Sequence, residues 1–321
     1  MSGKFAGSTA FRSALIVTGA TYISYGLGLL VSMVVARTLG PQDYGHYAYL
    51  VFLSGVLTAL YGNGLNLSAI RFVAESLGRA NLDEARRVHF QLGRWFVVSL
   101  VAVTILFFVF YPLLKPTDWN RPLWIFAVAV VISAVTKAGY LFGSSVSKGY
   151  GHFDIDARTI SLMSFANLFA ALACAYLVAP IDAFLWCFVA VSAGHLIVTQ
   201  LFMRQAGIAA LPGAIDTSLR DRIRRHYVWT GIFLLVFMLS NKTIETLFLN
   251  ALGKPETVGW FAISASMTRG GVELLSSGLN TVLLPMMSHA LGSNDVARAH
   301  RILADAIRYF AFLGVALAGV G

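Results

Sequence analysis

The chain has 321 residues, of which 57% are hydrophobic and only 12% are charged, and its formal net charge is +9. A soluble domain carries about 25% charged residues, so this composition excludes a soluble globule of this length and indicates a membrane protein. The positive excess lies in short segments between apolar stretches, which argues against a nucleic-acid-binding surface.

Apolar stretches follow one another along the chain, each long enough for a membrane-spanning helix of about 20 residues. Because backbone groups in a bilayer must bond within their own segment, the sequence predicts an all-α, polytopic transmembrane protein. We read Cys174 and Cys187, which both fall inside apolar stretches, as small core residues. The predicted spans are residues 14–36, 47–68, 95–114, 123–147, 159–179, 184–203, 228–250 and 258–284, with a ninth beginning near residue 306.

The positions of Lys and Arg predict the orientation of these spans. If the spans alternate, 17 of the 24 Lys and Arg residues lie on the side of the N-terminus. Only four lie on the opposite side: Arg37, Lys115, Arg121 and Lys254. Lys and Arg concentrate in cytoplasmic loops, so we predict a cytoplasmic N-terminus.

An amphipathic stretch precedes the third span. Leu82, Ala85, Val88 and Leu92 form an apolar stripe with arginines beside it, and Asn81 with Glu84 three residues later forms a variant of the capping box. This pattern predicts an interfacial helix that lies on anionic lipid headgroups.

Five ionisable residues fall inside the spans: Lys137, Lys242, Glu245, Arg269 and Glu273. Each charge at mid-bilayer costs at least about 2.5–3.5 kcal/mol, so a functional role is the first hypothesis. An alternative is self-pairing, because Glu245 follows Lys242 by three residues and Glu273 follows Arg269 by four. Lys137 has no acid on its own helix face, so it needs an acid from another helix or an anionic ligand.

The sequence contains an internal repeat with an offset of 214 residues. The offset matches Gly45 to Gly259, Gly64-Leu65-Asn66 to Gly278-Leu279-Asn280, and Arg87 to Arg301, with no gap. Six predicted helices separate the copies, so both have the same orientation, which is a known plan for transporters with a substrate site between two lobes.

The repeat divides the chain into a six-helix lobe at residues 1–210, a basic cytoplasmic linker at 211–227 and a partial second lobe of about three helices at 228–321. The offset places Gly321 opposite Phe107, in the middle of the third helix of the first copy. We therefore expect the chain to be truncated, with the natural protein continuing through the rest of the second lobe.

Motifs of catalytic domains are missing. The sequence has no Gly-rich phosphate loop ending in Lys-Ser/Thr and no His-Glu-x-x-His motif, so we expect no ATP hydrolysis, no catalytic residue, no metal and no cofactor. Asp154-x-Asp156 resembles the cation-binding pair of sugar transferases, and ordinary loop acids are the simpler explanation.

The segment ARTLGPQDYGHYA at residues 36–48 resembles the end of the first helix in bacterial polysaccharide flippases of the multidrug, oligosaccharidyl-lipid and polysaccharide exporter superfamily. Residues 64–66 with 71–74, 252–253 with 258–262, and the repeat itself add to this resemblance. It implies two six-helix lobes that rock between inward-open and outward-open states.

The resemblance also implies a cargo, which is a sugar chain on a polyprenyl diphosphate. We predict a flippase of the bacterial inner membrane that serves O-antigen (lipopolysaccharide) or exopolysaccharide synthesis, with membrane lipids, a polysaccharide polymerase and glycosyltransferases as partners. Arg269, Lys137 and Lys242 are the predicted diphosphate contacts, and Glu245 and Glu273 the predicted coupling or pairing acids. The alternatives are a peptidoglycan-precursor flippase, a cation-coupled drug exporter and, from another class, a membrane-embedded sugar transferase or polymerase.

Overall fold

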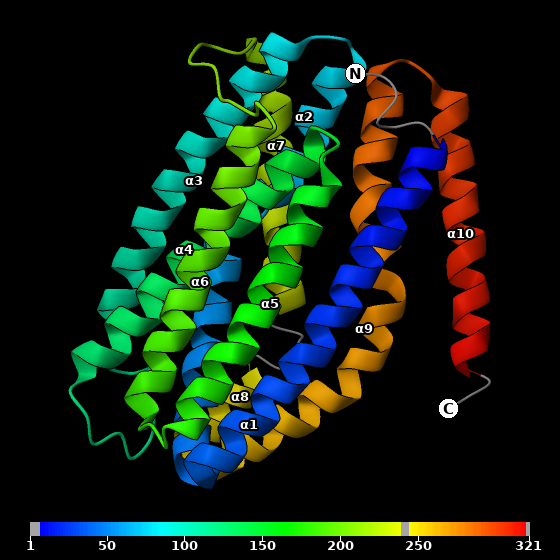
Figure 1. Ribbon diagram of the computed structural model, residues 1–321. Helices are drawn as coiled ribbons and strands as arrows, with labels where there is room; N and C mark the ends of the chain where they lie inside the picture. The colour runs from blue at the N-terminus through cyan, green and yellow to red at the C-terminus, as the bar shows by residue number, and fades with distance from the viewer. Residues whose placement is uncertain (1–6, 239–243, 319–321) are drawn as a thin grey trace.

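The computed structural model describes the backbone of residues 7–238 and 244–318, and their side chains apart from residues 7–15, 244, 266–282, 313–314 and 316–318. Within these ranges the regular secondary structure is helical, and the helices run up and down through one bundle (Figure 1). The predicted all-α class is therefore confirmed. The helices are α1 (Gly7–Gly62), α2 (Leu65–Gly78), α3 (Leu82–Phe110), α4 (Leu123–Gly149), α5 (Phe153–Tyr176), α6 (Ile181–Gln205), α7 (Thr217–Met238), α8 (Ile244–Leu252), α9 (Pro255–Gly292) and α10 (Val296–Ala318).

Several of the described helices are each long and apolar enough to cross a membrane. Five stretches qualify in the described part of the chain: residues 16–62, 82–110, 123–149, 153–176 and 181–205. Large apolar side chains of α3, such as Val98 and Val109, are exposed on the surface of the bundle, where lipid is their natural solvent. The protein is a multi-pass membrane protein.

The first two predicted spans lie in α1, which comprises two helical segments that meet in a sharp kink at Gly40. Gly40 adopts φ 73° and ψ 174°, a backbone conformation that residues with a Cβ atom rarely adopt. Pro41 follows it directly. The bend defines one end of the bundle, the Gly40 end. The opposite end, where α2 stops at Gly78, is the Gly78 end (Figure 1).

The interfacial helix predicted at residues 82–92 is wrong. These residues form the first turns of α3, which continues without a break to Phe110. Ala85, Val88 and Leu92 are fully buried because the apolar stripe packs into the core and not onto lipid headgroups. Half of the predicted capping box is present, since the Asn81 side chain accepts a hydrogen bond of 3.0 Å from the Glu84 backbone N–H. The Glu84 side chain instead accepts from Ser76 and pairs with Arg79.

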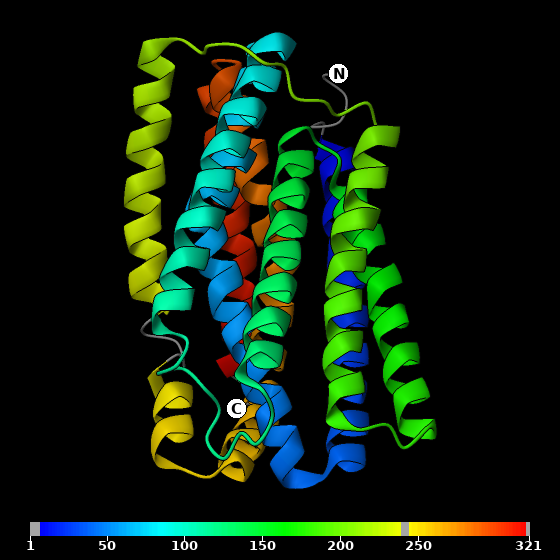
Figure 2. The same cartoon turned by 90° about the vertical axis from the view of Figure 1, so that its left-hand side faces the viewer.

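The seventh predicted span differs from the structure at its start. Helix α7 begins at Thr217, well before the predicted residue 228, and its first turns carry the basic residues of the predicted linker. Figure 2 shows α7 at the margin of the bundle, connected to α6 by a long loop across the Gly78 end. The division into lobes and linker stays a prediction.

The two copies of the repeat meet at their matched glycines. A Cβ atom on Gly259 would lie 3.4 Å from the Cα of Gly45, and a Cβ atom on Gly78 would lie 3.1 Å from the Cα of Gly292. The first pair lies at the Gly40 end and the second at the Gly78 end, so α9 runs parallel to the α1–α2 segment that it repeats. Only glycine permits backbones to approach so closely at these four positions.

The repeat includes the turn that follows Gly78 in the first copy and Gly292 in the second. Ala80 and Asn294, which the offset matches, are both left-handed, with φ of 59° and 57°. Asn81 caps the N–H of Glu84, and its counterpart Asp295 caps the N–H of Arg298 at 2.9 Å. Two unlike sequences therefore close the same local structure, which supports a true duplication.

The glycine contacts predict a stability difference between two chemically identical substitutions. Gly292→Ala places a methyl group against the carbonyl oxygen of Glu75, so it should destabilise the protein by about 1–3 kcal/mol. Gly93→Ala is the matched control, because nothing lies within 4 Å of its Cβ position in helix α3, and it should stabilise the protein by about 0.5–1 kcal/mol. Thermal unfolding of the purified chain in detergent measures both changes. Equal unfolding temperatures for the two variants would contradict the close approach.

Candidate functional site

A basic cavity lies between α2 and α7, toward the Gly78 end. Its volume is about 320 Å³, within the usual range of small-molecule sites. It is the contact region between the first copy of the repeat and the helix that opens the second. Its lining residues are Arg71, Phe72, Arg222, Arg225, His226, Trp229 and Thr230.

A break between α1 and α2 lets α7 approach closely beside this cavity. Gly64 adopts φ 72° at the break, and a Cβ atom there would lie 2.6 Å from the carbonyl oxygen of Tyr227. Four residues later, the Ser68 hydroxyl lies 3.0 Å from Nδ1 of His226. The glycine therefore fixes the distance between the two walls of the cavity.

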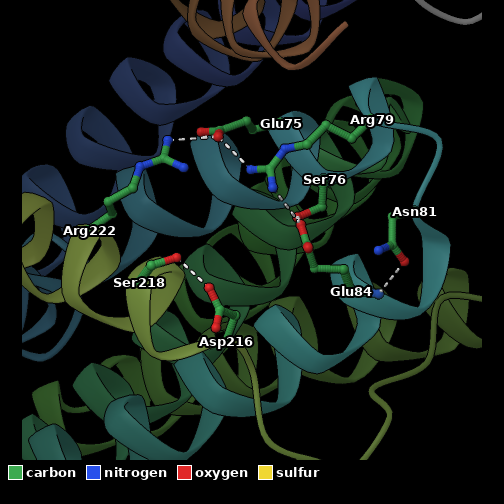
Figure 3. Close-up of polar contacts among 8 residues, drawn as sticks. All are labelled: Glu75, Ser76, Arg79, Asn81, Glu84, Asp216, Ser218 and Arg222. Carbon is green, nitrogen blue, oxygen red and sulfur yellow. Dashed lines mark hydrogen bonds and ion pairs between the residues drawn. The ribbon is translucent and has the colours of Figure 1, made fainter.

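A buried carboxylate joins the walls beside the cavity. Oε1 of Glu75, a residue that is 8% exposed, accepts hydrogen bonds from Arg79 at 2.5 Å and from Arg222 at 2.7 Å. Figure 3 shows Glu75 between these two arginines, with Glu84 of α3 accepting from Ser76 at 2.7 Å on the far side. The figure also shows the start of α7, where Ser218 donates to Asp216. Arg222 therefore links the first turns of α7 to Glu75 of α2 through this ion pair.

The cavity keeps a positive charge after this pairing. Within the described residues, Arg71 and Arg225 form no ion pair, and the Arg71 guanidinium lies 5.2 Å from the centre of the Phe72 ring. Arg222 approaches the same ring at 5.8 Å. Guanidinium groups held on aromatic faces keep their outward N–H groups for an anion.

His226 contributes a hydrogen-bonding group and no charge. Burial, and then the charge of Arg71, lower the pKa of His226 to about 4. His226 lies outside the predicted membrane spans, because the nearest one begins at residue 228. The ring is neutral at physiological pH, so the positive charge of the cavity comes from its arginines.

Lys137, a predicted diphosphate contact, has a partner on another helix. Its Nζ lies 3.3 Å from Nε2 of His195 on α6 and 5.1 Å from the centre of the Tyr140 ring. Nδ1 of His195 lies 2.9 Å from the carbonyl oxygen of Val191, which can only accept, so Nε2 presents a lone pair to the ammonium. Both contacts join Lys137 to residues of the first six helices, His195 of α6 and Tyr140 of α4.

The Asp154-x-Asp156 pair is used structurally at the start of α5. Asp156 is buried, accepts hydrogen bonds from Tyr140 at 2.8 Å and Ser144 at 2.6 Å, and pairs with Lys148 at 2.7 Å. Asp154 pairs with Arg158 at 3.4 Å. Within the described residues, no group of three or more His, Cys, Asp or Glu side chains could hold a metal ion.

The other predicted site residues fall largely outside the description. Lys242 lies outside the described residues, and Arg269 and Glu273 lie in α9 at positions whose side chains are not described. Glu245 is exposed in the first turn of α8. The assignment of these residues and Lys137 to one cavity stays a prediction.

In the sequence, Arg71 and Arg222 contributed only to the predicted orientation of the spans in the membrane. Nothing in the local sequence joins two residues 151 positions apart, but the repeat offered an indirect signal. It marked Gly64 as part of a duplicated motif, although the predicted second span, 47–68, runs through this residue without a break. Basic residues near the junction of the copies are candidates for ligand contacts.

Comparisons with known proteins agree with this architecture. A family model described as "Polysaccharide biosynthesis protein" matches residues 10–291. No curated protein sequence matches the chain significantly.

Solved structures show the same fold at low sequence identity. A mutant of the Vibrio cholerae MATE transporter VcmN has a TM-score of 0.76 and 14% identity, over 97% of this chain and 72% of its own. A MATE structure in the straight conformation has a TM-score of 0.74 and 14% identity, over 97% and 71%. A structure described as a MOP superfamily transporter from Pyrococcus furiosus, whose binding pocket is said to have reverse polarity, has a TM-score of 0.73 and 14% identity, over 96% of this chain and 71% of its own.

Removal of the Glu75 carboxylate should loosen the contact between α2 and α7. Glu75→Gln leaves Arg79 and Arg222 without their shared counter-charge, and because both arginines are partly exposed we expect a loss of only about 1–2 kcal/mol. Asp83→Asn is the control, since that carboxylate is exposed and lies 3.9 Å from Arg86. Unfolding temperatures measure the effect. A drop of the same size in both variants would mean that Glu75 has no special role.

Proposed function

The chain belongs to the polysaccharide biosynthesis protein family, and we propose that it is a flippase for polyprenyl-diphosphate-linked oligosaccharide units. The family match and the shared fold bear out the resemblance to polysaccharide flippases of the exporter superfamily. The proposed membrane is the bacterial inner membrane, with a cytoplasmic N-terminus. The proposed pathway is the synthesis of a surface polysaccharide such as O-antigen or exopolysaccharide. We propose a transporter and not an enzyme.

The basic cavity between α2 and α7 is the observation that carries this proposal. A diphosphate is a compact dianion or nearly so, and guanidinium groups bind phosphate oxygens through two parallel hydrogen bonds. Arg71 and Arg225 are the residues with charge to spare, and Phe72 and Trp229 supply aromatic faces beside them. Its excess of arginines opposes binding of an organic cation, so the cavity disfavours the drug-exporter alternative.

The position of the cavity fits the start of a flipping cycle. The predicted orientation places the Gly78 end on the cytoplasmic side, where the resemblance implies that the cargo is loaded. One wall belongs to the first copy and the other to the second. Movement of the copies would therefore change the shape of the cavity and release its anion, as alternating access requires.

Replacement of the cavity arginines should slow flipping. In liposomes loaded with a fluorescent polyprenyl-diphosphate oligosaccharide, we expect Arg71→Ala and Arg225→Ala each to lower the initial rate at least about tenfold, which is roughly 1.4 kcal/mol. Arg71→Lys should recover only part of the rate, because lysine keeps the charge without the planar fork. Arg158→Ala is the control, since this exposed arginine pairs with Asp154 away from the cavity. Wild-type rates in both alanine variants would contradict the proposal.

Deeper diphosphate contacts by Arg269 and Lys242, with Lys137, remain part of the proposal on sequence grounds. Arg269→Ala tests them in combination with Glu273→Gln. If Arg269 binds the cargo, the double variant should reach the membrane at wild-type levels and not flip. If Arg269 serves only to pair with Glu273, the double variant should flip normally, and this outcome would remove Arg269 from the binding site.

A further inference from the structure

A second polar cavity lies at the opposite end of the bundle from the basic one. Its volume is about 410 Å³, large enough for a small ligand. The cavity lies where α1 restarts after its bend and where the α3–α4 loop passes over it. Its lining residues are Gln42, Asp43, His46, Asn120 and Arg121.

His46 is a buried side chain with a free acceptor at this cavity. It is 3% exposed, and its Nε2 lies 2.9 Å from the carbonyl oxygen of Thr117. A carbonyl oxygen only accepts, so Nε2 carries a proton, and in this tautomer Nδ1 is an acceptor. Nδ1 has no hydrogen-bond partner among the described residues. The Asp43 carboxylate lies 3.8 Å away, beyond hydrogen-bond distance, and is also an acceptor.

Among the described residues no donor reaches Nδ1 of His46, whereas the Asp43 carboxylate has Arg121 at 3.7 Å. A buried acceptor without a donor costs about 1–3 kcal/mol, and a hydroxyl group that donates to Nδ1 of His46 would relieve it. A group that enters the cavity can supply such a donor.

The charges of the cavity nearly balance. Arg121 lies 3.7 Å from Asp43 and 3.2 Å from Asp182, so the guanidinium is held between two carboxylates. Two exposed amides, Gln42 and Asn120, complete the lining with groups that both donate and accept. This cavity therefore selects neither a strong anion nor a strong cation. It suits a ligand dense in hydroxyl groups, each of which is both donor and acceptor.

We propose that this cavity is a saccharide-binding site, in which one sugar hydroxyl donates to Nδ1 of His46 and another to the Asp43 carboxylate, while Gln42, Asn120 and Arg121 bind neighbouring hydroxyls. The identity of the saccharide as the glycan of the cargo rests on the proposed function. In the predicted topology this end faces away from the cytoplasm, so the site would hold the glycan after its passage.

The site adjoins the contact that closes this end of the bundle. The backbone N–H of Thr117 donates to Oδ1 of Asn250 on α8 at 3.2 Å, and the Thr117 hydroxyl donates to the backbone carbonyl of Asn250. Asn250 returns a hydrogen bond of 3.1 Å to the carbonyl oxygen of Lys115. His46 binds the same threonine through its carbonyl oxygen. A saccharide at His46 would therefore lie beside the α3–α4 loop, which is hydrogen-bonded to α8.

The experiment is a titration of the full chain in nanodiscs, with histidines labelled with ¹⁵N, by linear tetrasaccharides of glucose and of N-acetylglucosamine. We expect saturable binding with a shift of one Nδ1 resonance, assigned to His46 by its loss in His46→Gln. Asp43→Asn, and Gln42→Ala combined with Asn120→Ala, should weaken the affinity about fivefold or more, the value of roughly one hydrogen bond. Asp118→Asn is the control, because this exposed loop residue does not line the cavity.

Three outcomes would overturn the site. The first is no saturable binding of either tetrasaccharide to wild-type protein that flips its cargo. The second is binding that leaves the His46 resonance in place, as expected if an ordered water serves Nδ1. The third is equal or tighter binding of an uncharged tetrapeptide. Saccharide binding by protein that flips no lipid-linked oligosaccharide would keep the site and remove the proposed function, so the two failures are distinguishable.

Discussion

The structure depends on the close approach of two parallel backbones at matched glycines. In a bilayer the hydrophobic effect gives helices little reason to associate, so packing distance decides which helices stay together. Gly45 with Gly259 at one end, and Gly78 with Gly292 at the other, bring the two copies of the repeat into backbone contact. Each end also has its own polar connection: Thr117 with Asn250 at the Gly40 end, and Glu75 with Arg222 at the Gly78 end.

The two cavities, one toward each end of this arrangement, differ in chemistry. The cavity at the Gly78 end lies between the copies and is rich in arginine, which suits a diphosphate. The cavity at the Gly40 end is nearly neutral and rich in amides and acceptors, which suits hydroxyl groups. A lipid-linked oligosaccharide contains both groups. One ligand could therefore meet charge on one side of the membrane and hydroxyl-binding groups on the other.

The sequence predicted the features that follow from local patterns and failed where distant segments decide. Hydropathy identified the membrane helices, and the repeat identified the matched glycines, because both patterns depend only on the order of residues along the chain. The apolar stripe at Ala85 and Val88 was assigned to lipid because its partner, the folded core, is not visible in the sequence. Lys137 was expected to need an acid or an anionic ligand, and it contacts His195, 58 residues away on another helix. The Arg71 cavity was missed for the same reason, since its walls come from two different copies.

The central claim is that the two copies move against each other about their glycine contacts. Spin labels on exposed, repeat-matched positions report this movement at both ends: Gln42 with Glu256 at the Gly40 end, and Asp83 with Ala297 at the Gly78 end, in a background without Cys174 and Cys187. Pulsed electron–electron distance measurements in nanodiscs, with and without a polyprenyl-diphosphate oligosaccharide, follow both pairs. The account predicts that the cargo lengthens the distance at one end while it shortens the distance at the other. Distances that stay constant, or that lengthen together at both ends, would contradict it.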